Sequence, residues 1–490
     1  MEADVVVVGF GAAGACAALE AAAAGADVLV LDRFSGGGAT ALSGGVVYAG
    51  GGTSHQLKAG VTDSAEAMYD YLSTETADVV SAETLREFCR DSVQMLEWLE
   101  QHGVPFDSSL CPYKTSYPTN RHYLYHSGSE LARGDVAPPA ARGHRAHGKG
   151  TSGKIFFARL AEAVQRNGIK VLPQTTAQQL ITDDEGRVVG VQCRSLRKRR
   201  AHRILNRLAA KPFLYAPKIG RVMHRWVEKL ERKHGTTIRV HARRGVIMAA
   251  GGFVNNRSMM REHAPDYRGG LPLGTPGDDG SGINLGLSVG AAAAHLDRVS
   301  VWRFLTPPAA LVNGVLVDAA GQRVCDESRY GAAIGDAIIS KHGGKAWLVV
   351  DRGLIKQAKS QLRTQTLWFQ RLQTWYLLSK LKKGTPGIDP AGLEATLKEC
   401  ADTKPLQQPY SLIDMSIRRR IGYPAPMLTL GGLMVDEQTG QALRPDGTPL
   451  KGLYAAGRNA VGICSNSYVS GLSLADCVFS GRRAGAHAAQ

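Results

Sequence analysis

The first 32 residues contain the pattern of a dinucleotide-binding unit, and this pattern limits the fold more than any other part of the chain. The run Val5 to Val8 predicts a buried strand, which enters the loop GFGAAG at 9–14, and an Ala-rich helix follows up to Ala24. A second strand, 27–31, ends at Asp32. Strand, glycine loop, helix, strand and terminal acid, in this order, are typical of a Rossmann-type α/β fold.

Each residue type in this unit has a physical reason. Gly9 suits the tight turn, Gly11 lets the backbone approach a pyrophosphate, and Gly14 lets the helix pack closely on the strand. The first helical residues, Ala12 and Ala13, offer free N–H groups to the phosphates. Asp32 is placed to accept hydrogen bonds from ribose hydroxyls.

The bulk properties exclude several classes of protein. The chain has 490 residues, enough for two or three domains, and no apolar run approaches the roughly 20 residues that cross a bilayer. The first strand begins at residue 4, so we expect no signal peptide. Eight cysteines are scattered without metal-type spacing, which indicates reduced thiols, a cytoplasmic location and no metal site.

The net charge of +16 is concentrated in one segment, 194–234. Residues 194–233 hold 14 Lys and Arg against two acids, where strands 188–193 and 237–241 need only a short turn. Ile219, Val222, Met223, Trp226 and Leu230 recur at helical spacing with basic residues opposite, and Pro217 suits a first helical turn. We expect this segment to lie at the inner face of the cell membrane. A solvated arm or an oligomer contact is the alternative. Segment 194–234 lacks any nucleic-acid-binding motif, so we do not expect a nucleic-acid partner.

Five motifs together resemble the flavoprotein family of fumarate reductases and 3-ketosteroid dehydrogenases. They are GFGAAG with Asp32, Ser43-Gly44-Gly45, AAGGF at 249–253, GDDGSGINLG at 277–286 and GLYAAGR at 452–458. The resemblance implies bound FAD, an FAD-binding domain built from both chain ends, and a cap domain that closes over the flavin. We therefore expect residues 1–292 and 427–490 to form the FAD-binding domain. Residues 293–426, which differ in texture from the Gly-rich flanks, are expected to form an inserted α+β cap.

Within the family, the C-terminal motif favours a steroid over fumarate. In SYVSGLSLAD at 467–476, Tyr468 falls where fumarate reductases carry a substrate-binding Arg, and LTLGG at 428–432 lacks their His. A buried dicarboxylate without these partners would cost on the order of several kcal/mol. The Tyr-x-Ser-Gly-Leu-Ser pattern instead resembles the 3-ketosteroid Δ4-(5α)-dehydrogenases, and the Gly-Pro-rich segment expected of Δ1-dehydrogenases is not found.

The resemblance also implies site residues. Desaturation beside a ketone needs a base, donors for the developing enolate and a hydride acceptor. Tyr468 is the expected base, Ser470 its relay, and Tyr330 a second hydroxyl from the cap. The expected FAD contacts, beyond those of the first unit, are Arg33, Thr40, Ser43, Gly44, Gly45, Ala250, Gly251, Gly457, Arg458, Gly471, Leu472, Ser473 and Leu474.

The expected activity is therefore introduction of a C4–C5 double bond into 5α-3-ketosteroids. Alternatives are a Δ1-dehydrogenase or enone reductase on the same scaffold, or a flavoprotein subunit for membrane electron transfer. Relatives that attach flavin covalently use a His ahead of the Gly-Gly at 44–45. The stretch Gly36 to Ser43 has none, so we expect non-covalent FAD. The electron acceptor, a quinone or an artificial dye, stays open.

Overall fold

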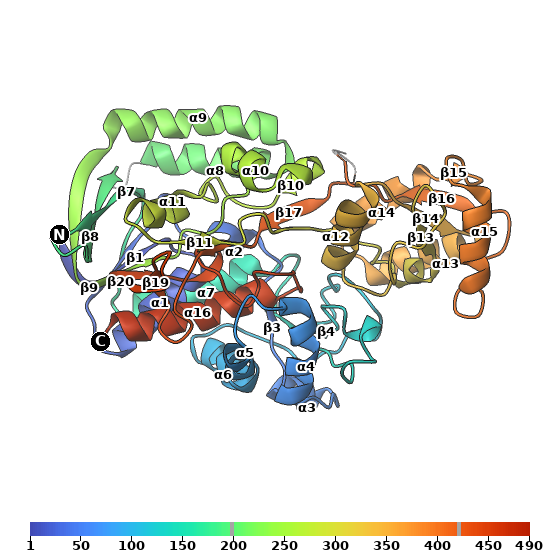
Figure 1. Cartoon of the computed structure of the whole chain (residues 1–490), viewed down its shortest axis with the longest axis horizontal. Helices are drawn as coiled ribbons and strands as arrows, with labels where there is room; N and C mark the ends of the chain where they lie inside the picture. The colour runs from blue at the N-terminus through green and yellow to red at the C-terminus, as the bar shows by residue number, and fades with distance from the viewer. Residues whose placement is uncertain (197–199, 419–422) are drawn as a thin grey trace.

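The core of the molecule is an eight-stranded sheet. The structure is a computed structural model that describes residues 1–196, 200–418 and 423–490 (Figure 1). The parallel part contains β6 (Lys170–Leu172), β2 (Val28–Leu31), β1 (Glu2–Val8), β9 (Thr236–Met248) and β20 (Pro449–Ala455), in that order, and β19 (Gln441–Leu443) closes the edge. Val5, Val6 and Val7 are fully buried, as expected for a strand covered on both faces.

Both chain ends build this part of the fold. Helix α1 (Ala12–Ala23) packs on the C-terminal helix α16 (Leu472–Ala488), and β20 lies beside β9. The two helices approach closely because they meet through small residues. A Cβ at Gly481 would lie 2.6 Å from the Ala13 carbonyl oxygen, and one at Gly485 would lie 2.3 Å from that of Ala17. The expected α/β class with an FAD domain from both ends is confirmed.

Shorter elements surround the central sheet. Residues 65–101 form three helices, α4 (Ala65–Thr76), α5 (Ala82–Arg90) and α6 (Ser92–Gln101). A small sheet joins β3 (Val46–Tyr48), β5 (Gly143–Arg145) and β4 (Leu124–Tyr125). Further elements are α2 (Gly38–Leu42), α3 (Ser54–Lys58), α7 (Gly153–Arg166), α10 (Arg257–His263), α11 (Ser281–Ser288), β11 (Ala293–Ala294) and β18 (Gly432–Leu433).

A second body, drawn in yellow and orange in Figure 1, has its own antiparallel sheet and core. Its strands are β13 (Val315–Val317), β14 (Trp347–Val350), β16 (Ser411–Asp414) and β15 (Lys382–Lys383). Its helices are α12 (Gly331–His342), α13 (Arg352–Gln365), α14 (Trp368–Ser379) and α15 (Pro390–Glu399). A sheet of β10 (Leu271–Pro272), β17 (Pro426–Thr429) and β12 (Val299–Val301) lies between the two bodies. We call the second body the cap; the domain boundaries at 292 and 426 stay predictions.

The basic segment forms a helical hairpin of α8 (Arg200–Tyr215) and α9 (Pro217–His234) at the top of Figure 1. It follows β8 (Val188–Ser195), which pairs with β7 (Thr175–Thr182) and with the first half of β9. Ser195 pairs directly with Thr236, so a short turn would indeed have sufficed there. The expected apolar stripe is divided: Ile219, Val222 and Trp226 are exposed, whereas the side facing the protein carries His224 and Val227.

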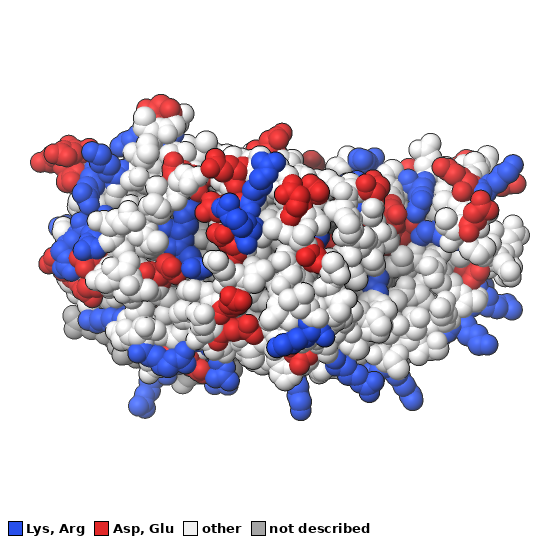
Figure 2. Space-filling view, turned by 90° about the horizontal axis from the view of Figure 1, so that it is seen from below, with Lys and Arg blue, Asp and Glu red and all other residues white. Residues whose placement is uncertain are grey.

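The surface charge is uneven as well. Figure 2 shows Asp and Glu interspersed with Lys and Arg over the upper and middle part of the view, whereas mainly Lys and Arg project along the lower edge. Within the described residues, no helix combines the length and the apolar character that crossing a bilayer requires. All eight cysteines are free thiols.

Candidate active site

One cavity of about 1730 Å³ joins the glycine loop to the cap. The first body contributes the GFGAAG loop, the end of β2 and the start of α16, and the cap contributes Tyr330 and part of α14. Of the residues expected to contact FAD, all but Gly14, Gly457 and Leu472 line this cavity. The structure therefore brings segments from opposite ends of the chain to one site.

The glycine loop has the geometry that its sequence predicts. Gly9 has a φ of +108°, and a Cβ there would lie 2.4 Å from the Ala249 carbonyl oxygen. Gly14 faces the strand rather than the cavity, since a Cβ would lie 1.9 Å from the Gly9 carbonyl oxygen. Gly11 leaves the start of α1 open toward the cavity, and Thr40 Oγ1 accepts a hydrogen bond from Ala12 N at 3.0 Å. These glycines are required by close packing and by an open helix N-terminus.

Asp32 lies at the carboxyl end of β2 and lines the cavity. Its carboxylate accepts hydrogen bonds from the backbone N–H groups of Phe34 (2.8 Å), Gly36 (2.9 Å) and Phe10 (3.1 Å). Burial nevertheless raises the pKa of Asp32. The three N–H groups fix the carboxylate in the place where a ribose would lie beside it.

Two residues that follow β20, Arg458 and Asn459, have buried side-chain nitrogen atoms without a hydrogen-bond partner among the described residues. Arg458 pairs with Asp278 at 2.6 Å, yet its Nη1 is buried and has no hydrogen-bond partner among the described residues. The same holds for Nδ2 of Asn459, whose Oδ1 accepts from Ala250 N at 3.0 Å. Buried donors of this kind are normally satisfied, and of the two residues Arg458 lines the cavity, so a polar ligand such as a dinucleotide fits beside Arg458.

The start of α16 forms another wall. Gly471 has a φ of +95°, and a Cβ there would lie 2.7 Å from Tyr48 N, so only glycine fits. Ser473 and Leu474 line the cavity, whereas Leu472 is fully buried behind them. The positive end of this helix dipole therefore points into the site. Gly457 lies behind the wall with a φ of +60°.

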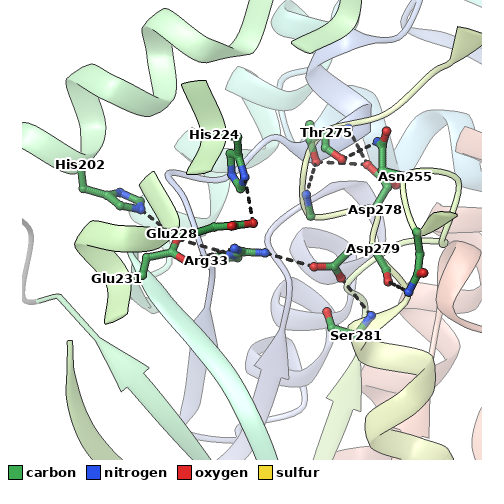
Figure 3. Close-up of polar contacts among 12 residues, drawn as sticks. Arg33, His202, His224, Glu228, Glu231, Asn255, Thr275, Asp278, Asp279 and Ser281 are labelled. Carbon is green, nitrogen blue, oxygen red and sulfur yellow. Dashed lines mark hydrogen bonds and ion pairs between the residues drawn. The ribbon is translucent and has the colours of Figure 1, made fainter. Parts of the chain in front are cut away.

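The helical hairpin packs against the residue after Asp32, as Figure 3 shows. Arg33 pairs with Glu231 of α9 at 3.0 Å and with Asp279 at 3.1 Å, and His202 of α8 reaches Glu231 at 3.0 Å. Burial alone would raise the pKa of Glu231, but hydrogen bonds from His202 and Arg33 hold it below its usual value. Asn206 and Phe213 of α8 line the cavity, so the hairpin closes one of its sides.

The three expected catalytic residues come together at the cap end of the cavity. The rings of Tyr330 and Tyr468 lie 6.2 Å apart, and Ser470 lines the cavity beside them. Burial raises the pKa of both tyrosines, so both phenols are protonated at neutral pH. The site holds neutral hydroxyl groups inside an apolar wall, which suits a ketone rather than a carboxylate.

Sequence reasoning gave no role to two residues that contact this group. Tyr125 of β4 forms a hydrogen bond of 3.2 Å with Ser470, and the ring of Trp302 lies 4.9 Å from that of Tyr468. Tyr125 belongs to a Tyr-rich loop, which was the available signal. Its position beside Ser470, 345 residues away, depends on the tertiary fold.

Comparison with known proteins places the chain in a family. The profile described as FAD binding domain matches residues 4–471. The chain belongs to this family of FAD-binding flavoproteins, and FAD is its cofactor. It is 38% identical over 494 residues, 93% of this chain and 92% of the relative, to the 3-oxo-5-alpha-steroid 4-dehydrogenase of Comamonas testosteroni.

Two solved structures have similar folds. A 3-ketosteroid-delta4-(5alpha)-dehydrogenase from Rhodococcus jostii RHA1, in complex with 4-androstene-3,17-dione, is 32% identical with a TM-score of 0.81 over 100% of this chain and 97% of that chain. A 3-ketosteroid delta1-dehydrogenase from Sterolibacterium denitrificans reaches a TM-score of 0.67 at 19% identity, over 100% and 99% of the two chains. The second likeness shows the fold alone.

Proposed function

We propose that this protein is an FAD-dependent 3-ketosteroid dehydrogenase that introduces a C4–C5 double bond into 5α-3-ketosteroids. The observation that carries the proposal is the group of hydroxyls of Tyr330, Tyr468 and Ser470 in the same cavity as the glycine loop, with the buried Tyr125 hydrogen-bonded to Ser470 from behind the cavity wall. The similarity to two Δ4-type enzymes supports it.

Each hydroxyl residue of the cavity has its own proposed role in the reaction. Bound FAD supplies a hydride acceptor at flavin N5. The phenolate form of Tyr468, a small fraction at neutral pH, takes the proton from the carbon next to the ketone and becomes the neutral phenol, and Tyr330 donates a hydrogen bond to the carbonyl oxygen as negative charge develops there. Ser470, which is hydrogen-bonded to Tyr125 and shares the cavity with Tyr330, would orient the hydroxyl of Tyr330.

We propose that the walls of the cavity hold the cofactor. The open N-terminus of α1 would face the pyrophosphate, and Asp32 would accept the ribose hydroxyls. Arg458, which lines the cavity, would donate its unsatisfied N–H group. The N-terminus of α16 would stabilise negative charge on the reduced flavin ring. Residues 293–426 would form the cap domain between the two parts of the FAD domain, 1–292 and 427–490.

The decisive experiment mixes the purified protein anaerobically with 5α-androstane-3,17-dione. Rapid bleaching of the flavin absorbance and formation of 4-androstene-3,17-dione are expected. The same steroid without the 3-keto group is the control, because its protons at C4 are no longer acidic, and it should leave the flavin oxidised. A 1-ene product, or no bleaching, contradicts the proposal. After bleaching by the substrate, the flavin should be reoxidised by a quinone or by an artificial dye.

We further propose that segment 194–234 holds the protein at the inner face of the cell membrane. Ile204, Leu208, Ile219, Val222 and Trp226 of the hairpin are 53–62% exposed and stand among exposed basic side chains. An interfacial helix of this kind combines apolar burial with attraction to anionic lipid. The free thiols support a reducing compartment.

Point substitutions test this contact better than a deletion, because the opposite side of the hairpin packs on Arg33. Replacing Ile219, Val222 and Trp226 by Ser should weaken sedimentation with anionic vesicles at low salt and leave steroid-driven bleaching unchanged. Replacing 197–233 by a Gly-Ser turn should abolish sedimentation due to the hairpin. Equal sedimentation of all three proteins would refute the hairpin contact.

A further inference from the structure

The cap carries an exposed surface that the steroid reaction does not use. In α14, Trp368, Leu372 and Trp375 are 71%, 60% and 65% exposed. Their spacing of four and three residues places them on one face of the helix. Large exposed aromatic residues that lie together mark an interaction site rather than ordinary surface.

The neighbouring helix α13, which contacts α14, carries a row of basic residues. Arg352, Lys356, Lys359 and Arg363 of α13 are all exposed, and their spacing of four, three and four residues places them on one helix face. Residues 352–388 contain eight Lys and Arg and neither Asp nor Glu. We call the three apolar residues of α14 and the four basic residues of α13 the cap surface. It fits a partner that is both negatively charged and apolar.

The cap surface adjoins the mouth of the cavity. Phe369 and Gln373, neighbours of the apolar residues in α14, line the cavity, and Gln373 is exposed. Ile219 of the hairpin also lines the cavity while being 61% exposed. The cavity therefore reaches the surface at α14 and at the first turn of α9.

We infer that the cap surface binds an anionic lipid bilayer, so that a steroid dissolved in the bilayer enters the cavity beside α14. Trp favours the interface between lipid and water, and each basic side chain near an anionic membrane contributes about 1 kcal/mol. The docking stands on the cap residues alone. The entry of a steroid rests on the function proposed above.

Vesicle sedimentation with the full-length, FAD-loaded protein tests the docking. Vesicles of phosphatidylcholine and phosphatidylglycerol should pellet the protein at low salt, and pure phosphatidylcholine should not. The double variant Leu372→Ser, Trp375→Ser should weaken binding about tenfold or more. A matched control, Leu57→Ser with Leu287→Ser, removes two apolar residues that are 67% and 41% exposed elsewhere, and should bind like wild type.

The charge contribution has its own matched pair. Lys356, Lys359 and Arg363 replaced by Gln should also weaken binding, whereas exposed Lys58, Lys170 and Lys451 replaced by Gln should have less effect. Brominated lipids in the vesicles should quench tryptophan fluorescence, and Trp368→Phe with Trp375→Phe should remove at least half of that quenching. The double Phe variant retains Trp226 of the hairpin, so the two contacts are distinguished.

The outcomes separate docking from catalysis. All variants should keep flavin bleaching by steroid dissolved in buffer. Intact bleaching without vesicle binding of the wild type overturns the docking and leaves the proposed reaction standing. Equal binding by the cap variants and the wild type also overturns it. A change from dimer to monomer in the cap variants, without vesicle binding by the wild type, assigns the surface to a second copy of the chain and overturns the inference.

Discussion

At the scale of single residues, the site depends on hydroxyl groups whose surroundings keep them neutral. Burial raises the pKa of Tyr330 and Tyr468, so neither phenol ionises at neutral pH by itself. A protonated phenol donates a hydrogen bond to a ketone oxygen without repelling the charge that develops on it. The raised pKa also means that only a small fraction of Tyr468 is in the phenolate form, which is the form that acts as a base.

Replacing Tyr468 by Phe removes the proposed base and little else. FAD and steroid binding should stay close to wild type, and turnover should fall by about 100- to 10,000-fold, the range for a lost acid–base group. Ser470→Ala should have a smaller effect, because it acts through Tyr330. Stopped-flow bleaching and steroid titration measure both steps. A Tyr468→Phe enzyme that keeps more than about a third of its activity rules out Tyr468 as the base.

The pH dependence of the rate should report the same residue. Since burial raises the pKa of Tyr468 above its ordinary value of 10, the reactive phenolate increases about tenfold per pH unit throughout the neutral range. We expect log kcat/KM to rise from pH 7 to about pH 10 without a plateau, and the slope to vanish in Tyr468→Phe. Retained FAD at pH 10 is the control for folding. A plateau near pH 8 would contradict the assignment.

At the scale of elements, the helical hairpin has two distinct sides. One side packs on the cofactor wall through His202, Glu231 and Arg33, and the other exposes apolar residues to solvent. The periodicity of α9 predicted a helix with one apolar stripe, yet the side facing the protein is partly polar. This difference arises because the ion pair of Glu231 with Arg33 anchors the helix together with the buried side chain of Val227.

Weakening this anchor should loosen the cofactor. Glu231→Gln removes the charge that Arg33 and His202 share, so the hairpin should open more often and FAD should dissociate several-fold faster. The rise of flavin fluorescence after dilution measures the rate. Glu228→Gln, which changes a more exposed partner of His224, is the matched control and should release FAD like wild type. Identical FAD dissociation rates for both variants would show that the ion pair of Glu231 does not help to retain the cofactor.

At the scale of the whole molecule, one cavity collects residues from both chain ends and from the cap. Ser470 is hydrogen-bonded to Tyr125 of β4 and shares the cavity with Tyr330 of the cap, although the three residues lie far apart in the sequence. FAD is expected to be held by this enclosure without a covalent bond. Acid denaturation should therefore release all of the yellow colour into the supernatant. Colour that stays on the precipitated chain would show a covalent link, for which the stretch 36–43 offers no His.

The sequence by itself determined the dinucleotide-binding unit and the class of fold, and it predicted the principal site residues. These features depend on local requirements: a positive φ at Gly9, a close approach at Gly14, an acid at the end of β2. The Tyr-x-Ser-Gly-Leu-Ser pattern carried the steroid prediction because it removed the charge that fumarate needs.

Only the tertiary structure decided which of these residues meet and what surrounds them. Tyr125, Trp302 and the pairing of Arg33 with Glu231 were outside the reach of sequence patterns, because each contact joins segments more than 160 residues apart. The raised pKa values of the tyrosines, and the division of the hairpin into a packed and an exposed side, likewise arise from burial. Burial is a property of the assembled layers, which no local pattern contains.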